Sequence, residues 1–193
     1  VIQDGPKISQ VAVVGSDYPG MKPTMVVREG DRVTRGQALF TDKKNEGVVF
    51  TAPAAGIVVA INRGERRVFQ SLVIDTDGDK AEKFKSYKAD KLATLDRAAV
   101  VNNLVSSGQW VALRTRPYSK VPAIDSTPAS IFVTAMDTNP LSADPAVIIA
   151  QRSEDFINGL TVLTRLTDGP VNLCVAPDSG VVGHDIDGVR EIS

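Results

Sequence analysis

The sequence is poor in the side chains that most metal and nucleophilic chemistry requires. It contains one cysteine, Cys174, and one histidine, His184, in 193 residues. A single cysteine excludes an internal disulfide and any metal site built from several cysteines of this chain, and it fits a reducing compartment. Cys174 lies in an apolar run, where a buried thiol is poorly ionised, so we expect a core residue rather than a nucleophile.

Charge and hydropathy exclude two further classes of protein. The net charge is −1, so there is no basic excess to neutralise the phosphates of a nucleic acid. No apolar run approaches the roughly 20 residues that a membrane-spanning helix needs. Hydrophobic residues make up 42% of the chain, which is long enough for one large or two small globular domains.

A glycine-rich phosphate loop is also missing. Dinucleotide sites use G-x-G-x-x-G between a strand and a helix, so that backbone amides can approach the pyrophosphate. After Val133 the chain reads TAMDTNPLSADP, without a glycine. We therefore expect a scaffold rather than an NADH site. Asp137 and Asn139 follow this expected strand, where open α/β sheets usually bind ligands, so they are ligand candidates; the alternative is that they cap the loop.

The first part of the sequence has the pattern of a small β domain. Over residues 1–75, short Val- and Ile-rich segments alternate with Gly, Pro and Asp, as in strands separated by turns. A weak internal repeat pairs Val27-x-x-Gly30 and Gln37-x-Leu39 with Ile61-x-x-Gly64 and Gln70-x-Leu72. This arrangement resembles biotinyl/lipoyl carrier domains, which are flattened barrels (barrel-sandwich hybrids) of two similar halves.

The second part changes to helix and strand signals. Residues 75–91 are highly charged and predict a linker or solvated segment, after which Thr94 is expected to cap a helix that ends at Gly108. The apolar runs 130–134 and 171–175 predict strands, the first covered on both faces. Asp144 and Pro145 predict the start of one helix between them. Strand, helix and strand together predict a parallel βαβ unit.

These patterns predict a mixed α and β chain with two domains. Residues 1–86 are expected to form the barrel-sandwich hybrid and residues 87–193 a Rossmann-like α/β domain. Because a parallel sheet of so few strands is incomplete, we expect the α/β domain to be truncated and the sequence to be the N-terminal part of a longer protein.

Surface charges supply the other candidate sites. Lys43 and Lys44 lie where a carrier domain would present its modified lysine, but they lack the Met-Lys-Met context of biotin carriers, which favours a solvated hairpin tip. Arg63, Arg66 and Arg67 cluster around a Gly-Glu turn. They form either a solvated face or, with the two lysines, a docking surface for an acidic partner subunit or for lipid phosphate.

His184 stands between Gly183 and Asp185 in a polar, turn-rich segment. A histidine with a neighbouring carboxylate can act as a general base or a metal ligand. The surrounding glycines and acidic residues are equally typical of a surface turn, which is the arrangement we expect.

The combined motifs carry a more specific resemblance. The chain resembles the A-type subunit of the bacterial Na+-translocating NADH:quinone reductases over nearly its whole length, through Tyr18-x-Gly20-Met21-Lys22-Pro23, Phe40-x-Asp42-Lys43-Lys44, Phe50-Thr51-Ala52-Pro53 and Ala135-Met136-Asp137-Thr138-Asn139-Pro140-Leu141. The same pairing of domains is similar to the C-type subunit of the Rnf electron-transport complexes and to the flavin subunit of respiratory complex I.

The resemblance implies a peripheral subunit on the cytoplasmic side of the bacterial inner membrane. It would assemble with the other subunits of an oxidoreductase and translocase that passes electrons from NADH to ubiquinone and exports Na+. NADH, flavin and iron–sulfur groups would belong to those partners, so this chain alone would be inactive, with no catalytic, cofactor-binding or metal residue. Quinone contact has been linked to the subunit. Two alternatives stay open: a component like the C-type subunit of an Rnf complex, or a carrier-type barrel with a modified lysine.

Overall fold

The computed structural model describes residues 5–183 and 185–193 of the chain. These residues divide into two compact units. The barrel unit comprises the chain up to Lys85 together with Asn102–Asp125, and the α/β unit comprises Ser86–Val101 together with Ser126–Ser193. The segment Asn102–Asp125 thus packs with the barrel, although it comes after the domain boundary expected between residues 86 and 87. That boundary stays a prediction.

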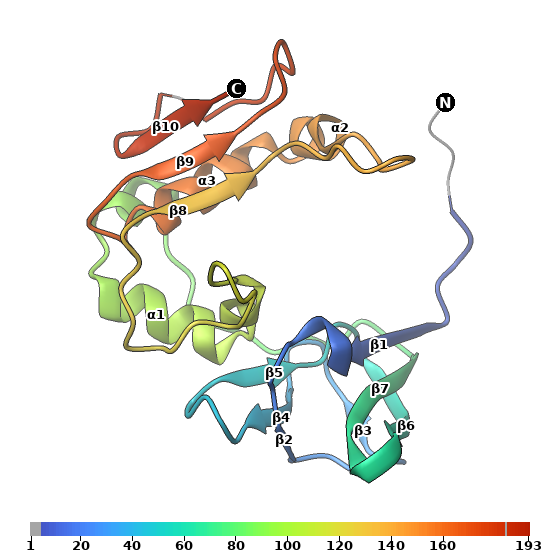
Figure 1. The fold of residues 1–193 in the computed structure, drawn as a ribbon. Coiled ribbons are helices and arrows are strands. Elements are labelled where there is room, and N and C mark those ends of the chain that lie inside the picture. The colour runs from blue at the N-terminus through green and yellow to red at the C-terminus, as the bar shows by residue number, and fades with distance from the viewer. Residues whose placement is uncertain (1–4, 184) are drawn as a thin grey trace. The chain divides into compact units, whose positions relative to one another are not determined.

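Seven strands of the described chain build the barrel unit, in two antiparallel sheets (Figure 1). One sheet has the order β1-β7-β6-β3 and the other the order β2-β4-β5. The strands are β1 (Gln10–Val14), β2 (Pro23–Met25), β3 (Arg32–Val33), β4 (Ala38–Asp42), β5 (Val49–Thr51), β6 (Gly56–Arg63) and β7 (Phe69–Thr76). Short 3-10 turns, η1 (Gly15–Asp17) and η2 (Glu65–Arg67), follow β1 and β6.

Aromatic side chains hold the inside of the barrel unit together. Phe40 is fully buried and stacks on Phe50 with ring centroids 4.6 Å apart, and Phe69 meets its edge at 5.2 Å. The turns around this core use glycine as expected, since Gly30 and Gly36 have φ of 91° and 87°. Such angles cost little for glycine and more for other residues.

The helix after residue 85 begins two residues later than expected. Helix α1 spans Arg97–Ser106, and the Asp96 carboxylate accepts a hydrogen bond from the Ala99 amide at 2.6 Å. Asp96 is therefore the capping residue, and the prediction of Thr94 was wrong. Thr94 closes the preceding turn η3 (Ala89–Thr94), where its hydroxyl donates to the Lys91 carbonyl. Gly108 follows the helix in the left-handed conformation, as expected, and leads into η4 (Gln109–Ala112).

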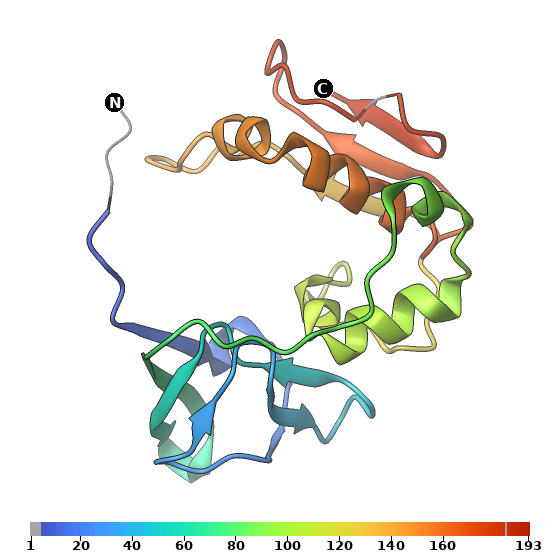
Figure 2. The same cartoon turned by 180° about the vertical axis from the view of Figure 1, so that it is seen from behind.

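The α/β unit contains a parallel sheet of order β10-β9-β8. Its elements are β8 (Ile131–Thr134), α2 (Pro145–Gln151), α3 (Ser153–Leu163), β9 (Val171–Cys174) and β10 (Val189–Ile192). Figures 1 and 2 show α3 lying on one face of this sheet, where Leu160 packs into a core of aliphatic residues that includes Val171 and Leu173. The predicted βαβ unit is confirmed.

Two details of this unit differ from the expectation. The predicted single helix is broken at Arg152, whose φ and ψ of −134° and 42° separate α2 from α3. Its start is as predicted, because the Asp144 side chain caps the Ala146 amide. Strand β8 was expected to be covered on both faces, but it lies at the edge of the sheet and its Phe132 is 62% exposed.

Candidate functional site

The three arginines of the expected basic cluster meet at the tip of the β6–β7 hairpin, which we call the arginine hairpin (residues 63–68). The tip is closed by hydrogen bonds from the Gly64 amide to the Val68 carbonyl at 2.8 Å and from the Arg67 amide to the Gly64 carbonyl at 3.0 Å. Arg66 and Arg67 both have positive φ, 53° and 61°. Non-glycine residues rarely adopt this conformation, and when they do so side by side the strain often marks a functional site.

The charge of the arginine hairpin is displayed rather than neutralised. Arg66 approaches Glu65 at 3.8 Å, but both side chains are about nine-tenths exposed, so water screens the pair. Arg63 donates to the Arg67 carbonyl at 3.3 Å, which stabilises the turn. Because this acceptor is a neutral carbonyl, the bond does not neutralise the charge of Arg63. Three guanidinium groups therefore face one carboxylate at this tip, beside Val68, whose side chain is 63% exposed.

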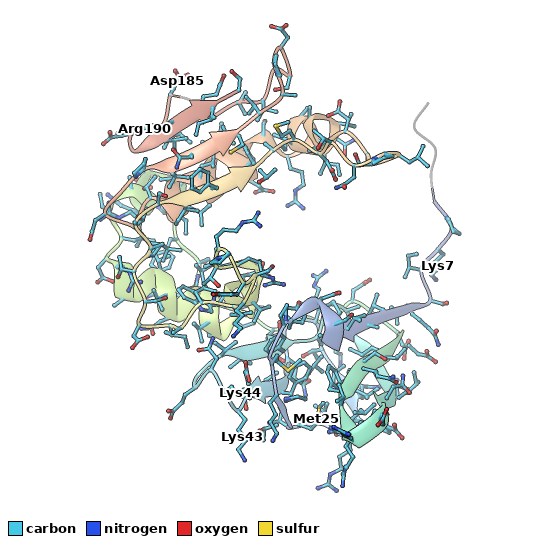
Figure 3. All side chains as sticks on the ribbon, viewed as in Figure 1. Lys7, Met25, Lys43, Lys44, Asp185 and Arg190 are labelled. Atoms are coloured by element: carbon cyan, nitrogen blue, oxygen red, sulfur yellow. The ribbon has the colours of Figure 1, made fainter. Side chains whose placement is uncertain are left out.

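The two candidate lysines lie on a different hairpin, between β4 and β5. Asp42, only 8% exposed, shapes the turn by accepting hydrogen bonds from the Lys22 and Lys44 amides at 3.0 and 2.9 Å. Lys43 and Lys44 are exposed, and Figure 3 shows their side chains extending away from the barrel strands. The next residue, Asn45, donates to two carbonyl oxygens of the segment Asn102–Asp125 within the same unit, at 3.1 and 3.0 Å.

The anchoring of Asn45 bears on the carrier alternative. A carrier hairpin presents its lysine on a tip that must reach distant partners. Here the residue after Lys44 is tied to the Val121 and Pro122 carbonyls, and a side chain at Gly47 would collide with Ile124 at 2.8 Å. The geometry therefore favours a solvated, internally braced tip over a swinging one.

Asp137 and Asn139 lie together at the carboxyl end of β8, as the sequence predicted. Both are exposed, and they bind each other: one Asp137 carboxylate oxygen accepts from the Asn139 amide at 2.9 Å and from its side chain at 2.7 Å. Ser142 adds a bond to the Asp137 carbonyl at 3.4 Å. These are the hydrogen bonds that capping of the loop requires.

Two further candidate residues, Cys174 and His184, remain. Cys174 is a free, half-buried thiol near the Asn172 carbonyl at 3.9 Å, and it is less buried than the expected core position. His184, the candidate base, lies outside the described residues. Over residues 5–183 and 185–193, no three histidine, cysteine or acidic side chains gather in a way that could hold a metal ion.

Sequence analysis missed one feature of the barrel unit, a groove of about 630 Å³ beside β1. It is bordered by Ala12–Val14 on one side and by Thr51–Pro53, Phe84 and Ser107–Gln109 among the residues on the other. The two sides are up to about a hundred residues apart in the sequence, so no local pattern connects them. The one local signal was the apolar strand sequence QVAVV.

A barrel of two small sheets followed by a parallel α/β unit defines a two-domain class whose first domain is a barrel-sandwich hybrid. Comparison with protein families finds the same two kinds of domain in the same order, although the second match also covers the segment Asn102–Asp125, which packs with the barrel unit. The family model described as the NqrA N-terminal barrel-sandwich hybrid domain matches residues 1–77, and that described as the NqrA second alpha/beta domain matches residues 95–193. The chain belongs to the NqrA family, and the fold class expected from its sequence is confirmed.

Curated relatives agree with this assignment. The A-type subunit of the Na(+)-translocating NADH-quinone reductase of Hahella chejuensis is 63% identical over 174 residues, which cover 90% of this chain and 39% of that protein. The proteins of the same name from Glaesserella parasuis and Haemophilus influenzae are 55% and 54% identical, over 100% and 98% of this chain and 44% and 43% of their own lengths. The chain thus spans about two fifths of the length of the relatives that it matches.

Proposed function

We propose that this chain is a docking and scaffold part of a peripheral subunit in a Na+-translocating NADH:quinone reductase. In this proposal the complex passes electrons from NADH to ubiquinone and exports Na+ across the bacterial inner membrane, and the chain lies on the cytoplasmic side. The names of the relatives, which designate the A-type subunit of a Na(+)-translocating NADH-quinone reductase, support this assignment. In the described part of the chain, no helix combines the length and the apolar character that crossing a bilayer demands.

The electron carriers are proposed to lie in partner subunits. NADH, flavin and iron–sulfur groups are proposed to belong to the other subunits of the complex, and this chain is proposed to hold no bound cofactor itself; quinone enters the proposal as the substrate of the complex. Two features of the sequence support this division: a single cysteine cannot ligate a cluster, and the loop after β8 has no glycine with which to approach a pyrophosphate. The chain alone is accordingly proposed to be inactive.

The arginine hairpin carries the docking proposal. Its positive charge is exposed, its one nearby carboxylate is screened by water, and its backbone holds a conformation that non-glycine residues seldom adopt. A strained, basic tip fits an acidic surface on a partner subunit, because complementary charge steers association and fixes orientation. Lys43 and Lys44 are proposed to add positive charge from the neighbouring hairpin.

A quinone-related role is the finer part of the proposal. Asp137 and Asn139 are its candidate residues, because polar groups at the carboxyl ends of parallel strands commonly contact ligands in α/β sheets. Their present hydrogen bonds close the loop. A quinone carbonyl would take the place of the Asp137 carboxylate as acceptor for the Asn139 side-chain amide.

Charge reversal of the arginine hairpin tests the docking role. The full-length protein with Arg63→Glu, Arg66→Glu and Arg67→Glu would be co-purified with the membrane complex at low and moderate salt. We expect retention to fall by at least about tenfold at moderate salt, because attraction is replaced by repulsion.

A matched control removes the effect of net charge. Lys7, Lys83 and Lys88 are exposed and lie elsewhere on the chain, so changing them to Glu alters the net charge equally. This control should be retained like the unmodified protein. Equal retention of the arginine variant and the control, with both still melting cooperatively, would refute docking through the arginine hairpin.

A further inference from the structure

Strand β1 has one hydrogen-bonded neighbour in the described structure. It is the end strand of the sheet β1-β7-β6-β3, and it pairs with β7 over its whole length, from Gln10 opposite Asp75 to Val14 opposite Ser71. Its other edge is open. A row of unpaired backbone N–H and C=O groups on such an edge is a template for another extended chain.

The hydrogen-bond pattern identifies the groups on the open edge. The Ser9 carbonyl accepts from the Thr76 amide at 2.8 Å, which makes these two residues a hydrogen-bonded pair. Hydrogen-bonded and non-hydrogen-bonded pairs alternate along an antiparallel ladder. Val11 and Val13 therefore direct their backbone groups to β7, whereas Gln10, Ala12 and Val14 direct theirs away from it.

Strand β1 carries none of the devices by which natural proteins protect an edge. Lysines, prolines, bulges and very short strands normally discourage pairing with other chains. The sequence of β1 is QVAVV, five residues without a charge or a proline, and its pairing with β7 continues without a register shift. By contrast, the pairing between β6 and β7 contains two irregularities. The open edge of β1 is thus regular and uncharged, and nothing within the strand prevents it from pairing with another chain.

The groove beside β1 provides room for a second strand. Its volume is about 630 Å³, and it is lined by Ala12–Val14 within the barrel unit. Phe84 and Val14 line it with side chains that are 38% and 37% exposed, which leaves apolar area for alternate side chains of an incoming strand. The opposite wall is built tightly, since a side chain at Gly108 would collide with the Thr51 hydroxyl.

The charged residues that line the groove indicate which charge a bound segment should carry. Three charged residues line it: Asp17, Glu82 and Arg35. The two carboxylates form no ion pair within the described chain, and Glu82 is held in place by the Thr34 hydroxyl at 2.5 Å. Two carboxylates against one guanidinium leave the lining residues with an excess of negative charge, which complements a basic partner. Arg114 donates to the Asp17 carbonyl at 3.4 Å and does not itself line the groove.

We propose that the groove binds an extended peptide segment of a partner protein, which adds to β1 as a further antiparallel or parallel strand. The segment alternates apolar side chains, which contact Val14 and Phe84, with polar ones that include lysine or arginine near Asp17 and Glu82. Backbone hydrogen bonds to Ala12 and Val14 supply the affinity, and the alternate side chains supply the specificity. This surface is separate from the arginine hairpin and does not depend on the function proposed for it.

Amide hydrogen exchange detects strand addition residue by residue. The probe is a synthetic peptide that alternates valine with lysine or threonine over about seven residues, which matches the reach of a five-residue strand. In its presence we expect exchange at Ala12 and Val14 to slow by at least about tenfold, while Val11 and Val13 are already slow. The same peptide with methylated alternate backbone amides keeps its side chains and charges, and it should have no effect. Unchanged exchange at Ala12 and Val14 with the probe at about 1 mM would overturn the proposal.

Two substitutions separate backbone pairing from charge. Ala12→Pro removes one outward N–H without removing a bond to β7, and proline is tolerated on such an edge. We expect it to weaken peptide binding about tenfold. Asp17→Lys should also weaken binding, whereas Asp79→Lys, exposed and outside the groove, should not. If Asp17→Lys and Asp79→Lys bind the probe equally, the preference for a basic segment is refuted. If the methylated peptide binds as well as the probe, strand addition at β1 is refuted.

Discussion

The two candidate sites treat their polar groups differently: the arginine hairpin of the barrel unit displays charge that no ion pair buries, whereas the polar residues after β8 in the α/β unit bind each other. At the arginine hairpin, guanidinium groups point into solvent on a strained turn, and the edge of β1 is unpaired. In the α/β unit, Asp137 and Asn139 follow the carboxyl end of β8, where such sheets usually bind ligands. There the two side chains bind each other. Of these two sites, the arginine hairpin is the one whose polar groups are left available to another molecule.

The hydrophobic cores of the two units also differ, in the kind of side chain that fills them. The barrel unit relies on an aromatic cluster in which Tyr18 meets the edge of Phe50 and Arg114 covers Tyr18 at 4.8 Å. The buried core of the α/β unit is aliphatic, built around Leu160 and Leu173, and one partly buried ring, Phe156, packs against it. Because aromatic rings bury more area and pack in defined geometries, the barrel core should tolerate truncation less well.

The largest expected effect comes from the centre of the aromatic cluster. Phe40→Ala should destabilise the barrel unit by about 3–5 kcal/mol, because Phe40 is fully buried between two other rings. Urea unfolding followed by the fluorescence of Trp110, the one tryptophan and a buried residue of this unit, measures the change. Phe132→Ala, followed by circular dichroism, is the matched control in the α/β unit, where an exposed ring should contribute less than about 0.5 kcal/mol. Similar losses for both variants would contradict the importance of the aromatic cluster.

A smaller effect is expected from two aspartates that both organise a turn. Asp42→Ala leaves the Lys22 and Lys44 amides without their buried acceptor and should cost about 1–3 kcal/mol. Asp137→Ala removes similar bonds in an exposed loop, where water replaces them, and should cost less than about 1 kcal/mol. Urea unfolding measures both, with fluorescence for the barrel unit and circular dichroism for the α/β unit. A larger loss for Asp137→Ala would reverse the comparison.

The smallest expected effect has the opposite sign. Gly159 lies inside α3 with nothing within 4 Å of an added methyl group, so Gly159→Ala should stabilise the α/β unit by about 0.5–1 kcal/mol. Gly108→Ala in the barrel unit should instead be destabilising, because φ is 75° there and the methyl group would meet Thr51. Thermal melting of both variants measures the difference, and a stabilised Gly108→Ala would show that the wall of the groove yields to an added methyl group.

Local signals predicted much of this molecule. Turn glycines such as Gly30, the cap at Asp144 and the two apolar strands of the βαβ unit all depend on residues close together in the sequence. Contacts between distant segments could not be predicted in this way. Asn45 is tied to residues more than seventy positions later, and Asn102–Asp125 packs with the barrel that precedes it.

At the candidate sites, the sequence predicted which residues lie together, but it did not predict their backbone conformations or hydrogen bonds. The arginines were identified as a cluster, but nothing in their sequence indicates that Arg66 and Arg67 both adopt positive φ. That conformation depends on closure of the hairpin by the flanking strands. The loop containing Asp137 was located correctly, while the choice between ligand contact and loop capping depended on where its hydrogen bonds go.

Hydrogen exchange of the full-length protein, free and within the assembled membrane complex, tests the division of roles most directly. If the barrel unit provides the docking surface, amides of the arginine hairpin should exchange at least about tenfold more slowly in the complex. The loop that holds Asp137 and Asn139 should exchange at the same rate in both states. Protection of that loop with no change at residues 63–68 would contradict the account.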